Sequence, residues 1–158
     1  MDNLLLQILK LQKTPIKREK VTADDVIAQQ DSLLKAINLI RKQNNLQSLK
    51  GSQQLNASAM EKALDLINQG YWAHQNPQGT QPWDFINQAG YDYRSAGENL
   101  ARGYTDEAKM IEAWLNSPSH KENIVNPQYR DIGIGRKDGY VATHFGRPKT
   151  PTIRELDL

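Results

Sequence analysis

The chain of 158 residues contains no cysteine. Disulfides, cysteine nucleophiles, cysteine-ligated zinc and iron–sulfur clusters are therefore excluded, and the fold depends on packing. An excess of one charge is also lacking, because 20 basic residues face 18 acidic ones and the formal net charge is +2. So small an excess does not predict a nucleic-acid partner or attraction to an anionic membrane.

Long apolar runs are missing as well. The apolar stretch from Leu4 to Leu11 is interrupted by Gln7 and Lys10, and it is shorter than the roughly 18 residues that a membrane span needs. It has neither the basic start nor the small-residue cleavage site of a signal peptide. The stretch predicts a short amphipathic helix, and the polar KTPIKREK that follows indicates a linker. Residues 1–23 are therefore interpreted as an N-terminal appendage.

Apolar residues at helical spacing predict two long helices, over about residues 23–44 and 52–69. Gly70 follows the second directly and is its expected left-handed cap. A shorter helix is expected over residues 82–89, and a third long helix begins after Thr105, its expected N-cap. Between these helices the chain is rich in Pro, Gly, Asn and Gln but carries large aromatic side chains, a pattern typical of functional loops.

The stretch AWLNSPSHKENI predicts a junction between two helices. Trp114 closes the first helix, Ser117 is a favourable N-cap and Pro118 is tolerated at the first helical position. The short helix that starts here carries His120 in its first turn.

The last third of the chain predicts a sheet. Two runs, residues 129–136 and 140–145, flank Asp138 and Gly139, and Asp-Gly between strands is a strong hairpin signal. In the I-G-I-G run at 132–135 the glycines leave one face without side chains, so another backbone is expected to approach closely. Helices first and strands last indicate an α+β fold rather than a doubly wound sheet.

Four residues could carry chemistry. The three histidines, His74, His120 and His144, are each unremarkable alone, since a lone histidine is usually a turn or surface residue. Glu98 lies between glycine and asparagine on an extended segment with apolar neighbours. A carboxylate there is either exposed or buried with partners, because an unpaired buried charge costs too much. Structural and functional roles both stay open.

The motifs in order are HQNPQG, AGY, GENLARG, AWLNSPSHKENI, IGIG and HFG. This order resembles the CAP superfamily of cysteine-rich secretory proteins, wasp-venom antigens and plant pathogenesis-related proteins, in particular its cysteine-free bacterial SCP-like branch. The resemblance covers about residues 26–148. It implies a three-layer α-β-α sandwich with a central, mostly antiparallel sheet, a domain over residues 24–148, and a C-terminal tail over residues 149–158.

The resemblance also implies a surface cleft lined by two histidines and two glutamates. His74 and Glu98 match the first of each, and His120 matches the second histidine. Ser117 stands where the second glutamate is expected. His74 and His120 are therefore candidate metal ligands, and a divalent metal such as zinc is a candidate cofactor, since two imidazoles and one carboxylate can hold it. The alternative is a hydrogen-bonded cluster that ties loop, sheet and helix together.

Three functions follow as expectations. The first is an exported module that binds a lipid, peptide, glycan or metal, with its signal or anchor elsewhere. The second is a hydrolase in which Glu98 or a metal-bound water is the base and His120 or His74 assists. The third is an interaction domain that docks through its N-terminal helix. Candidate ligand contacts are the loop aromatics and three polar residues: Trp72, Trp83, Tyr91, Asn99, Ser117 and His144.

Overall fold

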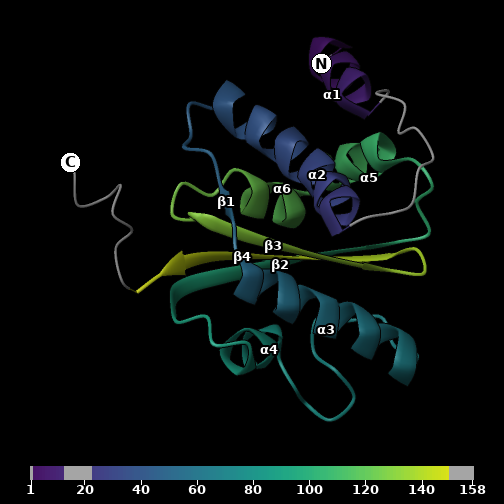
Figure 1. Ribbon diagram of the computed structural model, residues 1–158, viewed down its shortest axis with the longest axis vertical. Helices are drawn as coiled ribbons and strands as arrows, with labels where there is room; N and C mark the ends of the chain where they lie inside the picture. Colours follow the sequence, from purple (N-terminus) through teal and green to yellow (C-terminus); the bar gives the residue numbers. More distant parts are fainter. Residues whose placement is uncertain (1, 13–22, 150–158) are drawn as a thin grey trace. The chain divides into compact units, whose positions relative to one another are not determined.

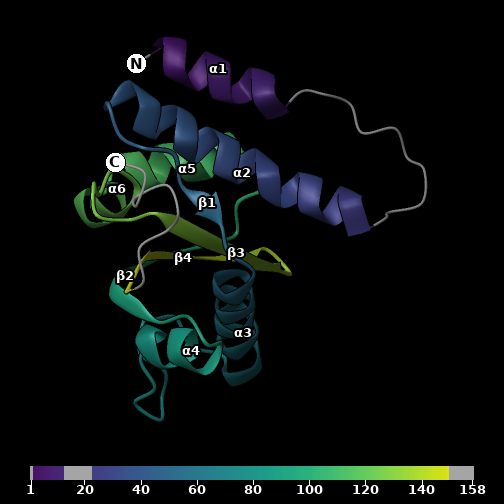
Figure 2. The same cartoon turned by 60° about the vertical axis from the view of Figure 1, so that its left-hand side comes forward.

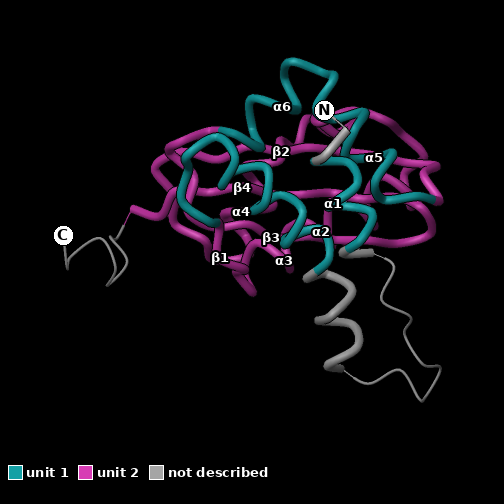
Figure 3. Tube along the Cα trace, turned by 90° about the horizontal axis from the view of Figure 1, so that it is seen from above, with its two compact units in different colours: residues 1–48, 106–125 teal, residues 49–105, 126–158 magenta. Residues whose placement is uncertain are grey.

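The computed structural model describes residues 2–12 and 23–149 and divides into two compact units. Unit 1 comprises residues 1–48 and 106–125, and unit 2 comprises residues 49–105 and 126–158 (Figure 3). The expected KREK linker and most of the expected C-terminal tail lie outside the described residues. Among the helices described, none combines the length and apolar character needed to cross a membrane.

Unit 1 is helical. It contains α1 (Asp2–Gln12), α2 (Ala23–Gln43), α5 (Glu107–Leu115) and α6 (Pro118–Ile124) (Figure 1). The expected N-terminal helix is present as α1, which contacts α2 and α5 and buries Ile8 to 1% exposure. An apolar stripe of α2 is fully or nearly buried: Leu33, Ala36, Ile37 and Ile40.

One helix end in unit 1 differs from the sequence-based expectation, and another shows a buried cation. The N-cap of α5 is Asp106 rather than Thr105, because the Asp106 carboxylate accepts the Ala108 amide hydrogen at 2.9 Å. At the end of α2, Arg41 is fully buried. Its guanidinium donates to the Gln47 carbonyl at 2.7 Å and to the Ile124 carbonyl at 3.0 Å, so it ties α2 to α6.

Unit 2 is a four-stranded sheet with two helices. Its elements are β1 (Lys50–Gly51), α3 (Gln53–Gln69), α4 (Pro82–Gln88), β2 (Tyr93–Arg102), β3 (Asp131–Lys137) and β4 (Tyr140–Pro148). The strand order is β1-β3-β4-β2; β4 is antiparallel to β3 and β2, and β1 is parallel to β3. Helices α3 and α4 lie on the same side of this sheet (Figure 2). The sequence did not predict β1, because two residues carry no periodic signal.

The turns of unit 2 confirm the glycine signals. Gly70 ends α3 with φ 66°, and Asp138 and Gly139 form the β3–β4 hairpin with φ 47° and 79°. A side chain at Gly133 would overlap the backbone of α3 at Leu55, and one at Gly135 would overlap it at Ala59. The expected close approach to the I-G-I-G run is therefore made by α3.

Candidate functional site

The site lies on the face of the sheet that α3 covers. Gly133, His144 and Glu98 are cross-strand partners on β3, β4 and β2, so they form one row across the sheet. Residues directly opposite each other on antiparallel strands point to the same face. The bare Gly133 lets α3 approach, and this approach brings Ser58 of α3 to His144.

His144 is the buried centre of this row. It is fully buried, its Nε2 lies 2.6 Å from Glu98 Oε2, and its Nδ1 lies 2.7 Å from the Ser58 hydroxyl. An ionised carboxylate only accepts hydrogen bonds, so Nε2 carries the hydrogen of the bond to Glu98. Ser58 and Glu98 therefore hold the ring at both nitrogens, and no direction is left for a ligand.

His74 approaches the same carboxylate from the loop after α3. Its Nδ1 lies 2.8 Å from Glu98 Oε1, and its side chain is 58% exposed while that of Glu98 is 1% exposed. Because the carboxylate accepts, Nδ1 carries the hydrogen of this bond. The Nε2 atom of His74 makes no hydrogen bond within the described residues. The site thus presents one oriented imidazole nitrogen that is backed by a buried carboxylate.

Glu98 is held in its charged form. Burial would raise the pKa of its carboxyl, but the hydrogen bonds from His144 and His74 and the charges of His144 and Lys62 keep that pKa below its ordinary value. Both carboxylate oxygens are occupied by imidazole nitrogens. Glu98 therefore orients two rings and is not itself accessible to a substrate.

Lys62 fastens the His74 loop to α3. Its ammonium is fully buried and donates to the Tyr71 hydroxyl at 2.9 Å, to the Ala73 carbonyl at 3.0 Å and to the His74 carbonyl. Burial lowers the pKa of this ammonium, and the nearby charges of Glu98 and Asp65 oppose the shift. All three donor positions of the ammonium are used within a short stretch of chain, so Lys62 acts as a clamp that fixes the backbone of His74.

Asp65, one helical turn after Lys62, fastens the rest of the loop. It accepts from the Tyr71 hydroxyl at 2.6 Å and from Asn76 at 3.2 Å. Asn76 in turn accepts the amide hydrogens of Gln78 and Thr80 at 3.0 and 2.8 Å. Burial, together with the bond to Asp65, raises the pKa of the Tyr71 hydroxyl, so it stays a donor. These hydrogen bonds hold the loop in one conformation, although most of its residues are exposed.

The aromatic candidates fall into two groups. Trp72 and Trp83 are 41% and 38% exposed, so both indoles face solvent. Tyr91 is buried, and its hydroxyl donates to Asp131 at 2.6 Å while its ring covers the space that a side chain at Gly146 would need. The contacts of Tyr91 are those of a core residue. Asn99 is likewise fully buried.

His120 belongs to unit 1. Its ring stacks on Trp114 with centroids 6.3 Å apart, and its Nδ1 lies 2.7 Å from the Ser117 hydroxyl. Ser117 is the N-cap of α6 by position and accepts the Lys121 amide through its carbonyl at 2.9 Å. Its hydroxyl makes no capping bond, contrary to the expectation, and contacts His120 instead. The expected meeting of His120 with His74 and Glu98 stays a prediction.

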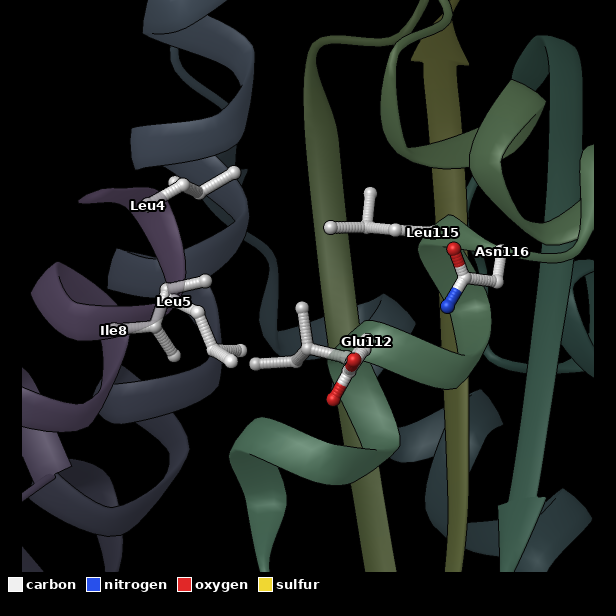
Figure 4. A pocket seen from close by; sticks show the side chains of 7 residues that line it. Leu4, Leu5, Ile8, Glu112, Leu115 and Asn116 are labelled. Carbon is white, nitrogen blue, oxygen red and sulfur yellow. The ribbon is translucent and has the colours of Figure 1, made fainter. Parts of the chain in front are cut away.

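An apolar pocket of about 280 Å³ lies within unit 1, between α1 and α5 (Figure 4). It is lined by side chains from both helices: Leu4, Leu5, Ile8, Ile111, Glu112, Leu115 and Asn116. The neighbouring Leu6 is 54% exposed. The expected amphipathic helix therefore uses one face inside unit 1 and leaves a leucine on the other.

Known proteins resemble this chain in sequence and in fold. The sequence profile of CAP, the cysteine-rich secretory protein family, matches residues 34–144. The chain belongs to the CAP family. It is 32% identical to the protein YkwD of Bacillus subtilis over an alignment of 128 residues, which covers 78% of this chain and 50% of YkwD.

Two solved structures are similar to this CAP domain. One is an extracellular protein containing an SCP domain from Bacillus anthracis, with TM-score 0.71, 26% identity, and coverage of 89% of this chain and 49% of that one. The other is an outer surface protein from Borrelia burgdorferi, with TM-score 0.70, 31% identity, and coverage of 76% and 92%. The likeness confirms the α+β, α-β-α sandwich fold. The chain spans about half the length of YkwD and of the B. anthracis protein.

The residues around Glu98 in unit 2 are not arranged to hold a metal ion. Within residues 2–12 and 23–149, no group of three or more His, Asp or Glu side chains is placed to hold one. Both oxygens of Glu98 are engaged, and both nitrogens of His144 are engaged. A metal ion that bound to Glu98 would have to displace one of the hydrogen bonds that its oxygens accept from His74 and His144. Zinc binding by His74 and His120 therefore stays a prediction from the family resemblance.

Two residues that contact the His74–Glu98–His144 cluster or its loop, Ser58 and Lys62, were not predicted from the sequence. Both lie on the buried face of α3, which also carries Leu55, Ala59 and Ala63. A signal was present, because polar residues at positions 58 and 62 interrupt an otherwise apolar stripe. A buried lysine has to be paired, so such an interruption on a core-facing stripe indicates a polar network.

Proposed function

We propose that this chain is an exported CAP domain that binds a small ligand on the surface around His74 and Trp72. His74 would supply the polar contact through its outward Nε2, and Trp72 the apolar contact area. Export is supported by the two similar structures, which are described as an extracellular and an outer-surface protein. Because the chain spans about half of some relatives, the proposal concerns the domain.

The pairing of the exposed His74 ring with the buried Glu98 carboxylate carries this proposal. Binding sites combine apolar surface with a few polar groups that are held in place before the ligand arrives. His74 is held by Glu98 at 2.8 Å, and its backbone is held by Lys62. The indole of Trp72, 41% exposed, lies two residues away on the same loop.

Binding can be tested with defined probes of the three expected ligand classes: a 12-carbon lysophosphatidylcholine, chitotetraose and trialanine. We expect at least one probe to raise the melting temperature and to move the His74 Nε2 nitrogen resonance. His74→Ala should abolish both effects, while Gln75→Ala, at an exposed neighbouring position, should leave them unchanged. If none of the probes moves the resonance or the melting temperature at saturation, the proposed binding function is wrong.

A second candidate, hydrolysis, is favoured by one observation. A carboxylate that holds Nδ1–H of a histidine leaves Nε2 as a base, which is how a general base is built. The structure favours His74 over the buried Glu98 for that role. Ser58 is fully buried and lies against His144, so it is not placed as an exposed nucleophile, and water would have to attack. Turnover of peptide or cell-wall substrates should then disappear in both His74→Ala and Glu98→Gln.

The third candidate, an interaction domain docking through α1, is kept as an alternative because Leu6 is exposed. Removing residues 1–20 and measuring the molecular mass in solution tests it. A mass corresponding to a monomer before and after removal would count against docking to another copy of the chain.

A further inference from the structure

We propose that Trp72, Arg102 and Tyr140 form a recognition surface for an acidic glycan, one that carries a carboxylate or a phosphate beside its sugar rings. This inference rests on the proposed binding function and names the class of ligand. The indole would receive the apolar C–H face of a sugar ring. The Arg102 guanidinium would bind the acidic group.

The three side chains are already assembled in unit 2. Arg102, the last residue of β2, and Tyr140, the first residue of β4, are cross-strand partners, so they point to the same face of the sheet. The Arg102 guanidinium carbon lies 4.6 Å from the centre of the Trp72 ring. The Tyr140 ring meets the same indole edge to face, with centroids 6.1 Å apart at 64°. Trp72 of the loop thus contacts both a cation and a phenol of the sheet, and its side chain stays 41% exposed.

The base of this surface is rigid. Tyr140 packs against a buried cluster that joins α3 to the sheet and includes Leu66, Leu100 and Ala142. Trp72 directly follows Tyr71, which Lys62 and Asp65 hold by hydrogen bonds. A platform held in this way loses little conformational entropy when a ligand binds.

The donors of Arg102 are available to a ligand. Arg102 is exposed, and its guanidinium makes no hydrogen bond or ion pair with any described residue. Stacking on Trp72 orients the planar group while leaving its N–H edge open. A guanidinium fork matches the two oxygens of a carboxylate or phosphate, and such charge-assisted bonds are the stronger kind. A neutral ligand would leave this group unused.

A second cation lies near Arg102 on the sheet. Lys137 is the β3 partner of Tyr140 and is exposed, so a second cation lies in the same row of the sheet. Asp138 in the following turn is the acidic neighbour in sequence. Because these groups are exposed, their attraction for an anion is screened by salt, and binding should weaken as ionic strength rises.

The spacing indicates an oligosaccharide rather than a single sugar. Glu98, which holds His74, and Arg102 are four residues apart on β2 and point to the same face. At about 3.3 Å per residue this separation is roughly 13 Å. A ligand that extends along β2 from the position of Glu98 to Arg102 therefore spans more than one ring.

The test uses calorimetric titration of the full chain at low ionic strength. The carboxylated probe is hyaluronan tetrasaccharide, the phosphorylated probe is mannopentaose phosphate, and the neutral probe is chitotetraose. We expect an acidic probe to bind about tenfold more tightly than the neutral one, the range of a charge-assisted hydrogen bond at an exposed site. Whichever acidic probe binds identifies the acidic group.

Substitutions test which side chain causes the preference for the acidic probe. Arg102→Gln should lower the affinity for the acidic probe to that of the neutral probe, and Trp72→Ala should weaken both. Arg94→Gln, an exposed arginine near the other end of β2, is the matched control and should change neither.

Three results would overturn the inference. They are equal binding of acidic and neutral probes, unchanged preference in Arg102→Gln, and binding to phosphatidylglycerol vesicles without binding to either acidic glycan. If lysophosphatidylcholine or trialanine moves the His74 resonance while no glycan binds, the glycan inference is wrong and the binding function stands. If nothing binds, both are wrong.

Discussion

His74 in unit 2 and His120 in unit 1 both lie in motifs that point to the CAP family, yet their rings meet different partners. Nδ1 of His74 contacts a buried carboxylate, which a second, buried histidine also contacts. Nδ1 of His120 contacts the hydroxyl of Ser117, and the ring stacks on Trp114. A carboxylate builds a charged, buried network around the ring, because each of its oxygens needs a donor once it is away from water. A hydroxyl is neutral, so removing it from water costs less than removing a carboxylate.

The largest expected effect on stability comes from removing Glu98, the carboxylate partner of His74. Glu98→Ala should lower the free energy of unfolding by about 3 kcal/mol or more, since it leaves the buried His144 without its carboxylate. Urea denaturation followed by fluorescence measures this. Glu98→Gln, which keeps the volume and one acceptor, should lose less. Equal stability of wild type and Glu98→Ala would contradict a buried charged network.

The clamp behind His74 should have the next largest effect. Lys62→Met leaves the carbonyls of Ala73 and His74 without their donor and should cost about 2 kcal/mol of unfolding free energy. The amides of residues 71–80 should also exchange hydrogen faster, as measured by mass spectrometry. Lys109→Met, at an exposed position on α5, is the control. A loop that stays protected in Lys62→Met would show that Lys62 does not hold it.

Acid should act on the His74 region through Glu98. Its folded pKa lies below the unfolded value of about 4.3, so its stabilising contribution is fully present above that value and is lost as the pH falls through the folded pKa. We expect the urea midpoint to fall below about pH 5 more steeply in wild type than in Glu98→Gln. The difference between the two proteins is the readout, because other carboxyl groups, Asp65 among them, titrate in both. If the urea midpoints of wild type and Glu98→Gln changed in parallel with pH, Glu98 would not be the group responsible.

The smallest effect is expected at the other histidine. Ser117→Ala removes one partly buried hydrogen bond to His120 and leaves the cap carbonyl in place, so it should cost about 0.5 kcal/mol. The His120 Nδ1 resonance should shift, and the His74 resonances should not. A cost as large as that of Glu98→Ala would erase the distinction between the two histidines.

Local signals in the sequence were sufficient for most of the framework. Gly70 as a cap and Asp138-Gly139 as a hairpin were predicted because each is decided by the backbone freedom of one or two residues. The cap at Asp106 was missed by one position, because Thr105 and Asp106 are both good caps and only the hydrogen bond to Ala108 distinguishes them.

The candidate site was only partly predictable. The GENLARG motif and the loop histidine pointed to Glu98 and His74, which the structure brings together. The second partner of Glu98 is His144, which was considered only as a ligand contact. Ser58 and Lys62 were missed because a helical stripe shows which face is buried but not what lies opposite it.

The sequence by itself determined the family, the α+β class, the order of the helices and of the longer strands, and Glu98 and His74 as site residues, because these depend on motifs and on contacts within a few residues. Only the tertiary structure decided which of them meet. Strand register sets His144 opposite Glu98, Gly133 lets α3 bring Ser58 to His144, and residues 40 positions apart in sequence, Tyr91 and Asp131, bond in the core. Such pairings depend on how separate elements pack, and no local pattern specifies that.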